Sequence, residues 1–271
     1  MPDYSVYPTP EYLTLPRPDE AWIIKDVLPV GGQMTLYGPP KLGKSYLALQ
    51  LAAAVSGDTL EWLGYDVAQN GRVIYLQFDT PRIVWQTEHL AHVLKSGRRM
   101  ERVWHGDRYS LPSPFNILDD DCAMVLQRIV QRINPLVLVV DTFREAHQGD
   151  EDKSGAMKLA LERLQHVAGT AALVLVAHAR KPSEWANTVI SGLRGSTYLT
   201  GKMDTIAQCG EKTVHLVGRA IANTTIKVQR EPYLWTVVLS ERQVAQAVAK
   251  ETGQSANALR MRWRRGRKFS K

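Results

Sequence analysis

The stretch that most constrains this chain lies near its N-terminus, in residues 33–54. An apolar run (34–37) leads into a glycine-bounded loop, and a segment rich in alanine and leucine (46–54) follows it. The loop has the spacing Gly, four residues, Gly-Lys-Ser, and its flanks predict a strand before it and a helix after it. Together these features indicate a P-loop, in which backbone N–H groups and a helix start surround phosphate oxygens. The residues that we expect to bind nucleotide are Gly38, Pro39, Pro40, Lys41, Leu42, Gly43, Lys44, Ser45 and Tyr46.

This pattern predicts ATP and Mg²⁺ as the ligands of the loop. Lys44 would place a positive charge on the β and γ phosphates, and the Ser45 hydroxyl would ligate Mg²⁺. A second metal-supporting group is Asp141, which ends the most apolar run of the chain (135–140) in the manner of a Walker B strand. A buried strand can also end in Asp by chance, but the P-loop upstream favours the metal-supporting role.

Two further apolar runs, at 72–77 and 172–177, are expected to form buried strands that also end at polar groups. Asp79 lies just beyond the first of these strands, and His178 follows the second. Because strands alternate with helical segments, the pattern predicts an α/β fold with a mostly parallel sheet covered by helices. The carboxyl ends of parallel strands meet at one edge, so Asp79, Asp141 and His178 should lie near the P-loop.

The remaining elements are less regular. Residues 82–95 have helical spacing, with Ile83, Leu90 and Leu94 on one face, whereas residues 98–114 show no clear period. Towards the C-terminus the pattern changes to short strands at close spacing, which we expect to form hairpins that extend the sheet. These strands are predicted at 213–217, 225–228 and 234–239.

Composition excludes several classes of protein. The chain has 271 residues, 44% hydrophobic and 23% charged, which is typical of a soluble globular protein. No apolar run approaches the ~20 residues that span a bilayer, and the N-terminus resembles no signal peptide. The two cysteines match no metal-binding spacing, so we expect reduced thiols in a cytoplasmic protein that does not associate with membranes.

The positive charge is concentrated at the C-terminus. The chain has 34 basic and 27 acidic residues, and residues 260–271 contain seven basic residues and no acidic one. Without those seven, the rest of the chain is formally neutral. A basic tail with interleaved aromatic residues suggests nucleic-acid binding, although a solvated basic end would have the same composition. The candidate DNA-binding residues in this tail are Arg260, Arg262, Arg264 and Arg265.

Three parts of the chain differ in character. Residues 1–20 are rich in proline and predict an extended arm, and residues 21–239 form the expected ATPase core. Residues 240–271 form a basic helical appendage, with a capped helix from Ser240, a break at Gly253 and a second helix from Ser255. Helix, short turn and basic helix suggest a helix-turn-helix, and the alternative is a helical hairpin packed on the core.

Five blocks in order carry a resemblance to a known family. They are the P-loop, the strand end at 77–81, the run at 141–152, the strand end at 176–181 and Arg194-Gly195-Ser196. Together they look like the RecA-type hexameric ATPases of the plasmid RepA replicative-helicase group, whose core is shared by phage ATPases that handle single-stranded DNA. The resemblance implies a RecA-like P-loop fold for the core. The resemblance covers roughly residues 20–228, and its two specific blocks are 141–152 and the strand ending at His178.

The resemblance implies roles for individual residues. The family has a water-activating Glu where this chain has Asp79. The shorter side chain reaches less far towards the water, which bears on the rate of hydrolysis and not on nucleotide binding. His178 stands where the family has a sensor of the γ-phosphate, although a histidine at a strand end can also be purely structural. The family usually has two adjacent histidines there, and Ala177 replaces the first.

Ring ATPases of this kind also use an arginine from the next subunit. The resemblance implies Arg219 for that role, with a surface cation as the alternative, and a homo-oligomer that is a hexameric ring. The segment from Arg180 to Arg194 has the position of the loop that contacts DNA in the ring channel. Arg180, Lys181 and Arg194 would there neutralise backbone phosphates.

These features favour an ATP hydrolase of the helicase or translocase type that depends on single-stranded DNA and acts in replication or recombination. The alternative is an ATP-switched single-stranded-DNA-binding protein for recombination or annealing, which would hydrolyse slowly because of Asp79.

Overall fold

The computed structural model describes residues 8–14, 22–147, 149, 154–179, 197–219, 221–231, 234–238 and 255. All seven predicted DNA-binding residues lie outside the described residues, as does most of the C-terminal appendage. These residues are Arg180, Lys181, Arg194, Arg260, Arg262, Arg264 and Arg265. Within the described residues, no helix is both long and apolar enough to cross a membrane.

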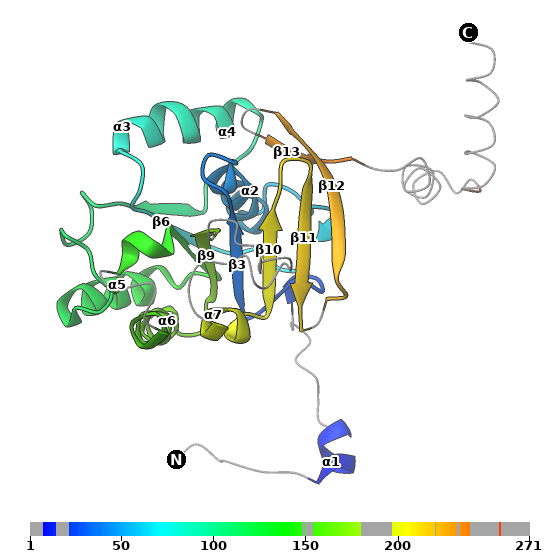
Figure 1. Ribbon diagram of the computed structural model, residues 1–271, viewed down its shortest axis with the longest axis horizontal. Helices are drawn as coiled ribbons and strands as arrows, with labels where there is room; N and C mark the ends of the chain where they lie inside the picture. The colour runs from blue at the N-terminus through cyan, green and yellow to red at the C-terminus, as the bar shows by residue number, and fades with distance from the viewer. Residues whose placement is uncertain are drawn as a thin grey trace, which may run out of the picture.

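A nine-stranded sheet forms the centre of the molecule, as Figure 1 shows. Its strands stand in the order β13-β12-β11-β10-β3-β9-β8-β6-β7. In chain order the bounds are β3 (Gln33–Gly38), β6 (Val73–Gln77), β7 (Val103–Gly106), β8 (Val137–Asp141), β9 (Ala172–His178), β10 (Thr205–Cys209), β11 (Thr213–Gly218), β12 (Thr224–Glu231) and β13 (Leu234–Val237). The mostly parallel α/β fold predicted from the sequence is confirmed.

The strands from β10 through β3, β9, β8 and β6 to β7 are parallel to one another. β6 and β8 are completely buried, which explains their unbroken apolar sequences, because a sheet covered on both faces needs no polar side. Their alternate side chains enter two hydrophobic clusters, one on each face of the sheet.

Helices cover both faces of the sheet (Figure 1). α2 (Lys44–Ser56) packs on one face, and its leucines and alanines join the first cluster. The other face is covered by α5 (Asp120–Ile133), α6 (Ser154–Ala168) and α7 (Thr197–Lys202). Asp119 caps α5, where its side chain accepts a hydrogen bond from the Cys122 N–H at 3.0 Å.

The four strands β10 to β13 form an antiparallel meander that extends the sheet beyond β3. The hairpin strands were predicted, but β10, which joins the meander to β3 in parallel, was not. Its sequence, Thr-Ile-Ala-Gln-Cys, mixes polar and small residues and therefore resembles neither a buried run nor a clear alternation. β7 was missed as well, within the segment 98–114.

The predicted helix at 82–95 is present, but of the three residues expected on its apolar face only Leu90 packs against the core. It consists of α3 (Arg82–Val84), a π-helical turn η1 (Trp85–Leu90) and α4 (Ala91–Lys95). Ile83 and Leu94 are 65% and 52% exposed, whereas Trp85 and Val93 are buried. A π-helical turn contains more residues than an α-helical turn, so it rotates the residues on either side of it onto different faces.

Shorter elements complete the described chain. They are α1 (Thr9–Thr14), β1 (Trp22–Ile24), β2 (Leu28–Pro29), β4 (Glu61–Trp62), β5 (Tyr65–Asp66) and the 3₁₀ turn η2 (Phe143–Ala146). β1 pairs with β2 and β4 pairs with β5, each in a two-stranded antiparallel sheet.

Candidate nucleotide site

The P-loop lies between the end of β3 and the start of α2, as its sequence predicts. Gly43 has φ 86°, in the left-handed region where glycine carries no Cβ penalty. Gly38 faces the neighbouring strand, and a Cβ there would stand 2.6 Å from the carbonyl oxygen of Cys209. Both glycines are therefore required by the local backbone, and the loop opens directly onto the first turn of α2.

A cavity of about 530 Å³ opens in front of this loop. Its walls come from the P-loop and from the ends of β6, β8 and β9, so the sheet brings together the groups that the sequence predicted at one edge. Residues from later in the chain and from the helix after β6 also contribute. The polar side chains of the lining are Lys41, Lys44, Ser45, Tyr46, Asp79, Thr80, His89, Asp141, Thr142, His178 and Arg230.

Lys44 lies along the P-loop and is only 5% exposed. Its Nζ donates to the carbonyl oxygens of Gly38 at 3.0 Å and Pro39 at 2.8 Å. Burial lowers the pKa of Lys44, and the nearby Cys209 thiol, Asp141 and Asp79 oppose that shift. The lysine is thus an ammonium group held at the cavity wall by two carbonyl groups, which a phosphate can replace as hydrogen-bond acceptors.

Asp141 ends β8 and is 4% exposed. Burial raises the pKa of its carboxyl, and hydrogen bonds from the Tyr75 hydroxyl and from Ser45, together with the charge of Lys44, counteract that rise. The Tyr75 bond measures 2.7 Å to Oδ2. Tyr75 was missed by sequence reasoning, because a tyrosine inside an apolar strand looks like any core aromatic residue.

The residues fit a magnesium site. The Ser45 side chain and Asp141 are in hydrogen-bond contact, and both line the cavity that the P-loop faces. Mg²⁺ usually takes one or two protein oxygens and completes its shell with phosphates and water. In the described part of the chain, no cluster of three or more His, Cys, Asp or Glu side chains suited to metal binding occurs.

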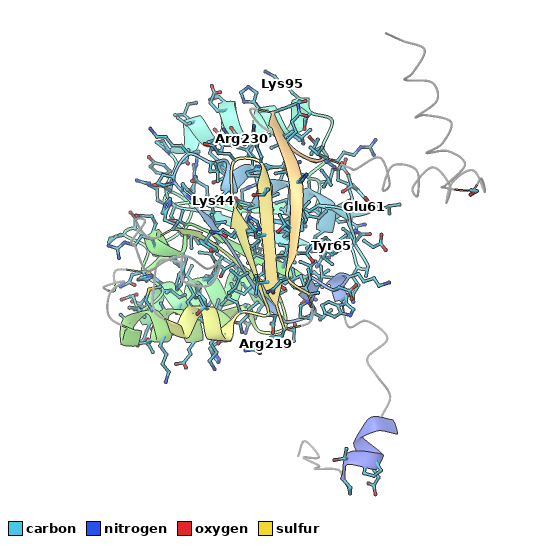
Figure 2. All side chains as sticks on the ribbon, turned by 45° about the vertical axis from the view of Figure 1, so that its right-hand side comes forward. Lys44, Glu61, Tyr65, Lys95, Arg219 and Arg230 are labelled. Atoms are coloured by element: carbon cyan, nitrogen blue, oxygen red, sulfur yellow. The ribbon has the colours of Figure 1, made fainter. Side chains whose placement is uncertain are left out.

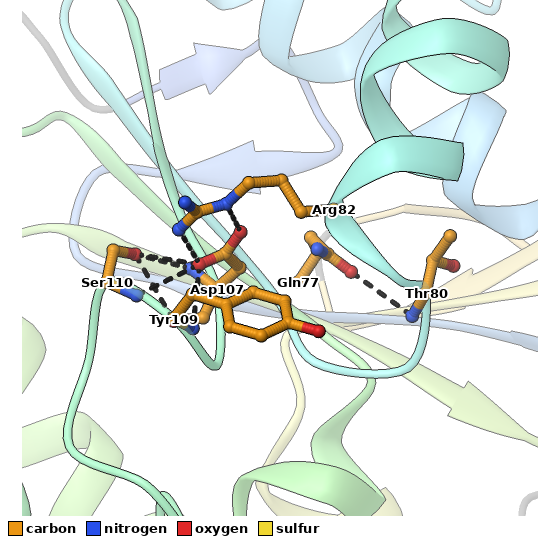
Figure 3. A network of polar contacts seen from close by, with 6 residues as sticks. All are labelled: Gln77, Thr80, Arg82, Asp107, Tyr109 and Ser110. Atoms are coloured by element: carbon orange, nitrogen blue, oxygen red, sulfur yellow. Dashed lines mark hydrogen bonds and ion pairs between the residues drawn. The ribbon is translucent and has the colours of Figure 1, made fainter.

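Asp79 is exposed on the cavity wall, and the segment around it is held from both sides. On one side, the Thr80 N–H donates to Gln77 Oε1 at 3.2 Å. On the other, the Arg82 guanidinium makes two bonds of 2.6 Å to Asp107, as Figure 3 shows. The hydrogen bond from Arg82 is the main reason that the pKa of Asp107 is lowered to about 2.

Two more polar groups complete the far wall. His178, at the end of β9, lines the cavity as predicted. Thr142, which follows Asp141, is 4% exposed, and its Oγ1 is buried with no hydrogen-bond partner among the described residues. A hydroxyl in that situation gains from a ligand oxygen or a water in the cavity.

Comparison with known proteins gives a family. The AAA domain family matches residues 9–184. This chain belongs to the AAA domain family. It is a P-loop ATPase, and nucleotide binding with Mg²⁺ is what such a family implies for the cavity.

A solved structure supports the fold of this AAA domain. The crystal structure of a KaiC-like protein from the hyperthermophilic archaeon Pyrococcus horikoshii OT3 matches with a TM-score of 0.52 at 15% sequence identity. The match covers 80% of this chain and 94% of that one. At this identity the likeness shows a common fold. None of the curated proteins compared with the sequence gives a significant match.

The AAA domain has a cation at the cavity that the sequence did not reveal. Arg230, at the end of β12, lines the cavity, and its Nη1 donates to the Lys41 carbonyl at 3.3 Å. Burial alternates along this strand: Ile226 and Val228 are buried on the face towards α2, so Arg230 continues that face over the P-loop. The pairing of β12 with β11 and β13 is what brings Arg230 to the P-loop, and the sequence alone does not show that pairing.

The β12–β13 hairpin is fastened to the P-loop and α2. Trp235 Nε1 donates to the Gly43 carbonyl at 3.0 Å. The Gln50 side chain both donates to the backbone carbonyl of Trp235, at 3.1 Å, and accepts from its N–H, at 3.0 Å. Because these bonds are buried, the hairpin and Arg230 are positioned together with the P-loop.

An aromatic stack borders the cavity on the other side. The Tyr46 and His89 rings are parallel, with centroids 4.8 Å apart, and Trp85 stacks on His89 at 4.9 Å. His89 and Trp85 come from the π-helical turn, and burial lowers the pKa of His89. Only Tyr46 was predicted to face nucleotide, since the π-helical turn that turns His89 inwards leaves no mark in the sequence.

Arg219 lies at the opposite edge of the sheet from the P-loop. Figure 2 shows it at the lower end of the strands, whereas Lys44 and Arg230 lie higher. It follows β11, whose end pairs with the start of β10, and its guanidinium donates to the Gly201 carbonyl at 2.8 Å and lies 3.5 Å from Asp204 Oδ1. Arg219 therefore cannot reach the cavity of its own chain.

Proposed function

We propose that this AAA domain hydrolyses ATP in a manner coupled to single-stranded DNA, as a homo-oligomeric ring of the RepA-like helicase or translocase type. The observation that carries the proposal is the gathering of Lys44, Asp79, Asp141 and His178 around one cavity in front of the P-loop. These are the residues that the resemblance assigns to phosphate binding, water activation, metal support and sensing.

In this proposal each group has a separate task. Lys44 binds the β and γ phosphates, and Mg²⁺ held by Ser45 and Asp141 would neutralise charge on the same oxygens. Asp79 orients the attacking water and accepts its proton. The hydrogen bonds around Asp79 fix the segment that carries it, so the carboxylate needs little reorganisation before the reaction.

The location of Arg219 supports the proposal of a ring. A cation is useful at the γ-phosphate in the transition state, and Arg219 is on the wrong side of its own sheet to supply it. In a head-to-tail ring, one subunit presents its P-loop edge and the next presents its opposite edge, which carries Arg219. The proposed assembly is a hexamer.

Single-stranded DNA as the partner is supported by charge. The seven basic residues at 260–271 account for the whole net charge of +7. Polyanion binding through such a segment releases counterions and is strongly salt-dependent. The 180–194 segment belongs to the same proposal, through the resemblance.

A second candidate is an ATP-switched protein that binds single-stranded DNA and hydrolyses slowly. It is favoured by one observation: Asp79 is exposed and shorter than the Glu that the resemblance to the RepA group implies at this position, so it places its carboxylate less far into the cavity. In that case ATP binding would change DNA affinity while turnover stays low.

Steady-state hydrolysis with and without a single-stranded oligonucleotide tests the proposal. The ring ATPase predicts turnover that rises at least several-fold with DNA. Tight ATP-dependent DNA binding with negligible turnover would favour the switch. A protein that hydrolyses ATP but neither binds nor responds to DNA would overturn both DNA-linked candidates.

A further inference from the structure

A second cleft, of about 450 Å³, opens at the same edge of the sheet as the nucleotide cavity. Its walls come from the end of β6, the loop that follows β7 and the turn η2 that follows β8. The side chains that matter are Phe78, Arg108, Phe115, Arg144, Glu145 and His147. The hydrophobic cluster on the face covered by α5 and α6 includes Phe78, Phe115 and the neighbouring Phe143. The cleft therefore lies on that side of the sheet, and the nucleotide cavity lies on the side of α2.

His147 offers a buried donor at this cleft. It is 3% exposed, and its Nδ1 accepts a hydrogen bond from the Gly149 N–H at 3.2 Å. A neutral imidazole whose Nδ1 accepts carries its proton on Nε2. Burial, reinforced by Arg144, lowers the pKa of His147 and so favours that neutral form. The Nε2 atom is buried and makes no hydrogen bond within the described residues.

Two guanidinium groups join this donor. Arg108 and Arg144 are exposed side chains, and their present partners are backbone carbonyls: Arg108 donates to Phe78 and Arg144 donates to Gly149 at 3.0 Å. Glu145 is the acidic member of the lining and balances one of the two charges. The described lining residues thus carry two positive charges and one negative charge, together with an unused buried N–H, which suit an anionic oxygen ligand.

The apolar part of the cleft wall favours a phosphodiester over inorganic phosphate as the ligand. The Phe78 and Phe115 rings stack with centroids 4.9 Å apart and form an apolar surface beside the cationic groups. A phosphodiester with its sugar presents charge and apolar surface side by side, whereas inorganic phosphate presents charge alone. A cleft also admits a flexible single strand more readily than the rigid, convex backbone of a duplex.

We infer that this cleft binds a backbone phosphate of single-stranded DNA, through Arg108, Arg144 and His147. The inference rests on the proposed function and deepens it, because it gives that function a DNA contact within the described residues. It also gives a route to the active site. Arg108 donates to the carbonyl of Phe78, and the next residue is Asp79. If a phosphate accepts the hydrogen bond of the Arg108 guanidinium, the Phe78 carbonyl loses this partner. The peptide that links Phe78 to Asp79 can then shift.

The test is binding of a fluorescent single-stranded oligonucleotide to the full chain, measured by anisotropy over a range of salt concentrations. Arg108→Gln and Arg144→Gln each remove one phosphate contact from an exposed side chain, so both should leave folding intact. Each is expected to weaken binding on the order of 5-fold and to reduce the salt slope by about 0.7. Arg132→Gln is the matched control, because Arg132 is an exposed arginine of α5 outside the cleft, and it should bind as the wild type does.

The outcomes separate this inference from the proposed function. If the wild type binds DNA and both cleft variants bind equally well with the same salt slope, the cleft assignment is wrong and the proposed function stands. If the wild type binds no single-stranded DNA even at low salt, both are wrong. Tighter binding of an RNA strand of equal length, lost in Arg108→Gln, would overturn DNA as the ligand.

Discussion

The Tyr75 hydroxyl donates a 2.7 Å hydrogen bond to Oδ2 of Asp141, across the pairing of β6 with β8. The two residues lie two positions apart in register on the same face of the sheet, since Asp141 is opposite Gln77. Tyr75 is fully buried, and the proximity of Asp141 adds to burial in raising its pKa well above the usual value. Tyr75 therefore stays protonated and donates to the carboxylate that is expected to support Mg²⁺.

Tyr75→Phe should impair the metal site without emptying the core. The hydrogen bond from Tyr75 lowers the pKa of Asp141, so its loss raises that pKa and moves the acid limb of the pH–rate profile to higher pH. Loss of an outer partner of a metal ligand costs about 10-fold in activity or metal affinity. An Mg²⁺ titration of hydrolysis measures it, with Tyr65→Phe as the control on β5. Unchanged Mg²⁺ dependence and pH profile in Tyr75→Phe would mean that Tyr75 does not position Asp141.

Asp79→Glu tests whether the shorter carboxylate limits hydrolysis. The side chain is exposed in the cavity, so an added methylene has room and brings the carboxylate nearer to an attacking water. General bases contribute about 10²–10⁴-fold, and we expect turnover to rise by about 10-fold or more. Asp79→Asn should lower it. A glutamate variant slower than the wild type would show that the site is built around aspartate.

Arg230→Ala should weaken ATP binding. Its guanidinium lies beside the P-loop, where a phosphate oxygen is a better acceptor than the Lys41 carbonyl that it contacts. The expected loss is roughly 3- to 10-fold in affinity, in line with the 1.5–3 kcal/mol range of charged hydrogen bonds reduced by exposure. Lys227→Ala is the matched control, because Lys227 is an exposed cation that alternates to the other face of β12. Equal affinities of the two variants, measured by titration with a fluorescent ATP analogue, would remove Arg230 from the site.

The free energy of unfolding is expected to depend on pH through the carboxylate of Asp107. Its folded-state pKa is lowered from 3.8 to about 2, chiefly by the hydrogen bond from Arg82. Because the unfolded chain binds the proton more readily, the contribution of Asp107 is complete above about pH 4 and is lost as the pH falls towards 2. Asp107→Asn should lower the melting temperature by a few °C at pH 7, and the difference from the wild type should shrink towards pH 3. The control is Asp66→Asn, at an exposed site. A constant difference at all pH values would contradict the role of the carboxylate charge.

The elements that could be predicted from the sequence are those whose residue pattern lies within one short stretch of the chain. The P-loop, the runs that became β6, β8 and β9, and the polar groups at their ends could be found because a strand buried on both faces must be apolar along its whole length. Asp79, Asp141 and His178 then had to lie near the P-loop once the sheet was parallel.

The features that were missed depend on tertiary structure. Arg230 reaches the cavity only through the hairpin that Trp235 and Gln50 fasten to α2. The π-helical turn at 85–90 brings His89 inwards and exposes Ile83, which no 3.6-residue pattern predicts. β10 and β7 have short, mixed sequences that form strands because a neighbouring strand is available to pair with them.

The most direct test of the account is steady-state ATP hydrolysis in Mg²⁺ by the wild type and by Lys44→Ala, with Lys95→Ala as the control at an exposed lysine outside the cavity. The account predicts measurable turnover for the wild type and the control, and a loss of about 100-fold or more for Lys44→Ala, because the phosphate-binding cation is removed. Equal turnover in wild type and Lys44→Ala would contradict the central claim that the cavity in front of the P-loop is where ATP is hydrolysed.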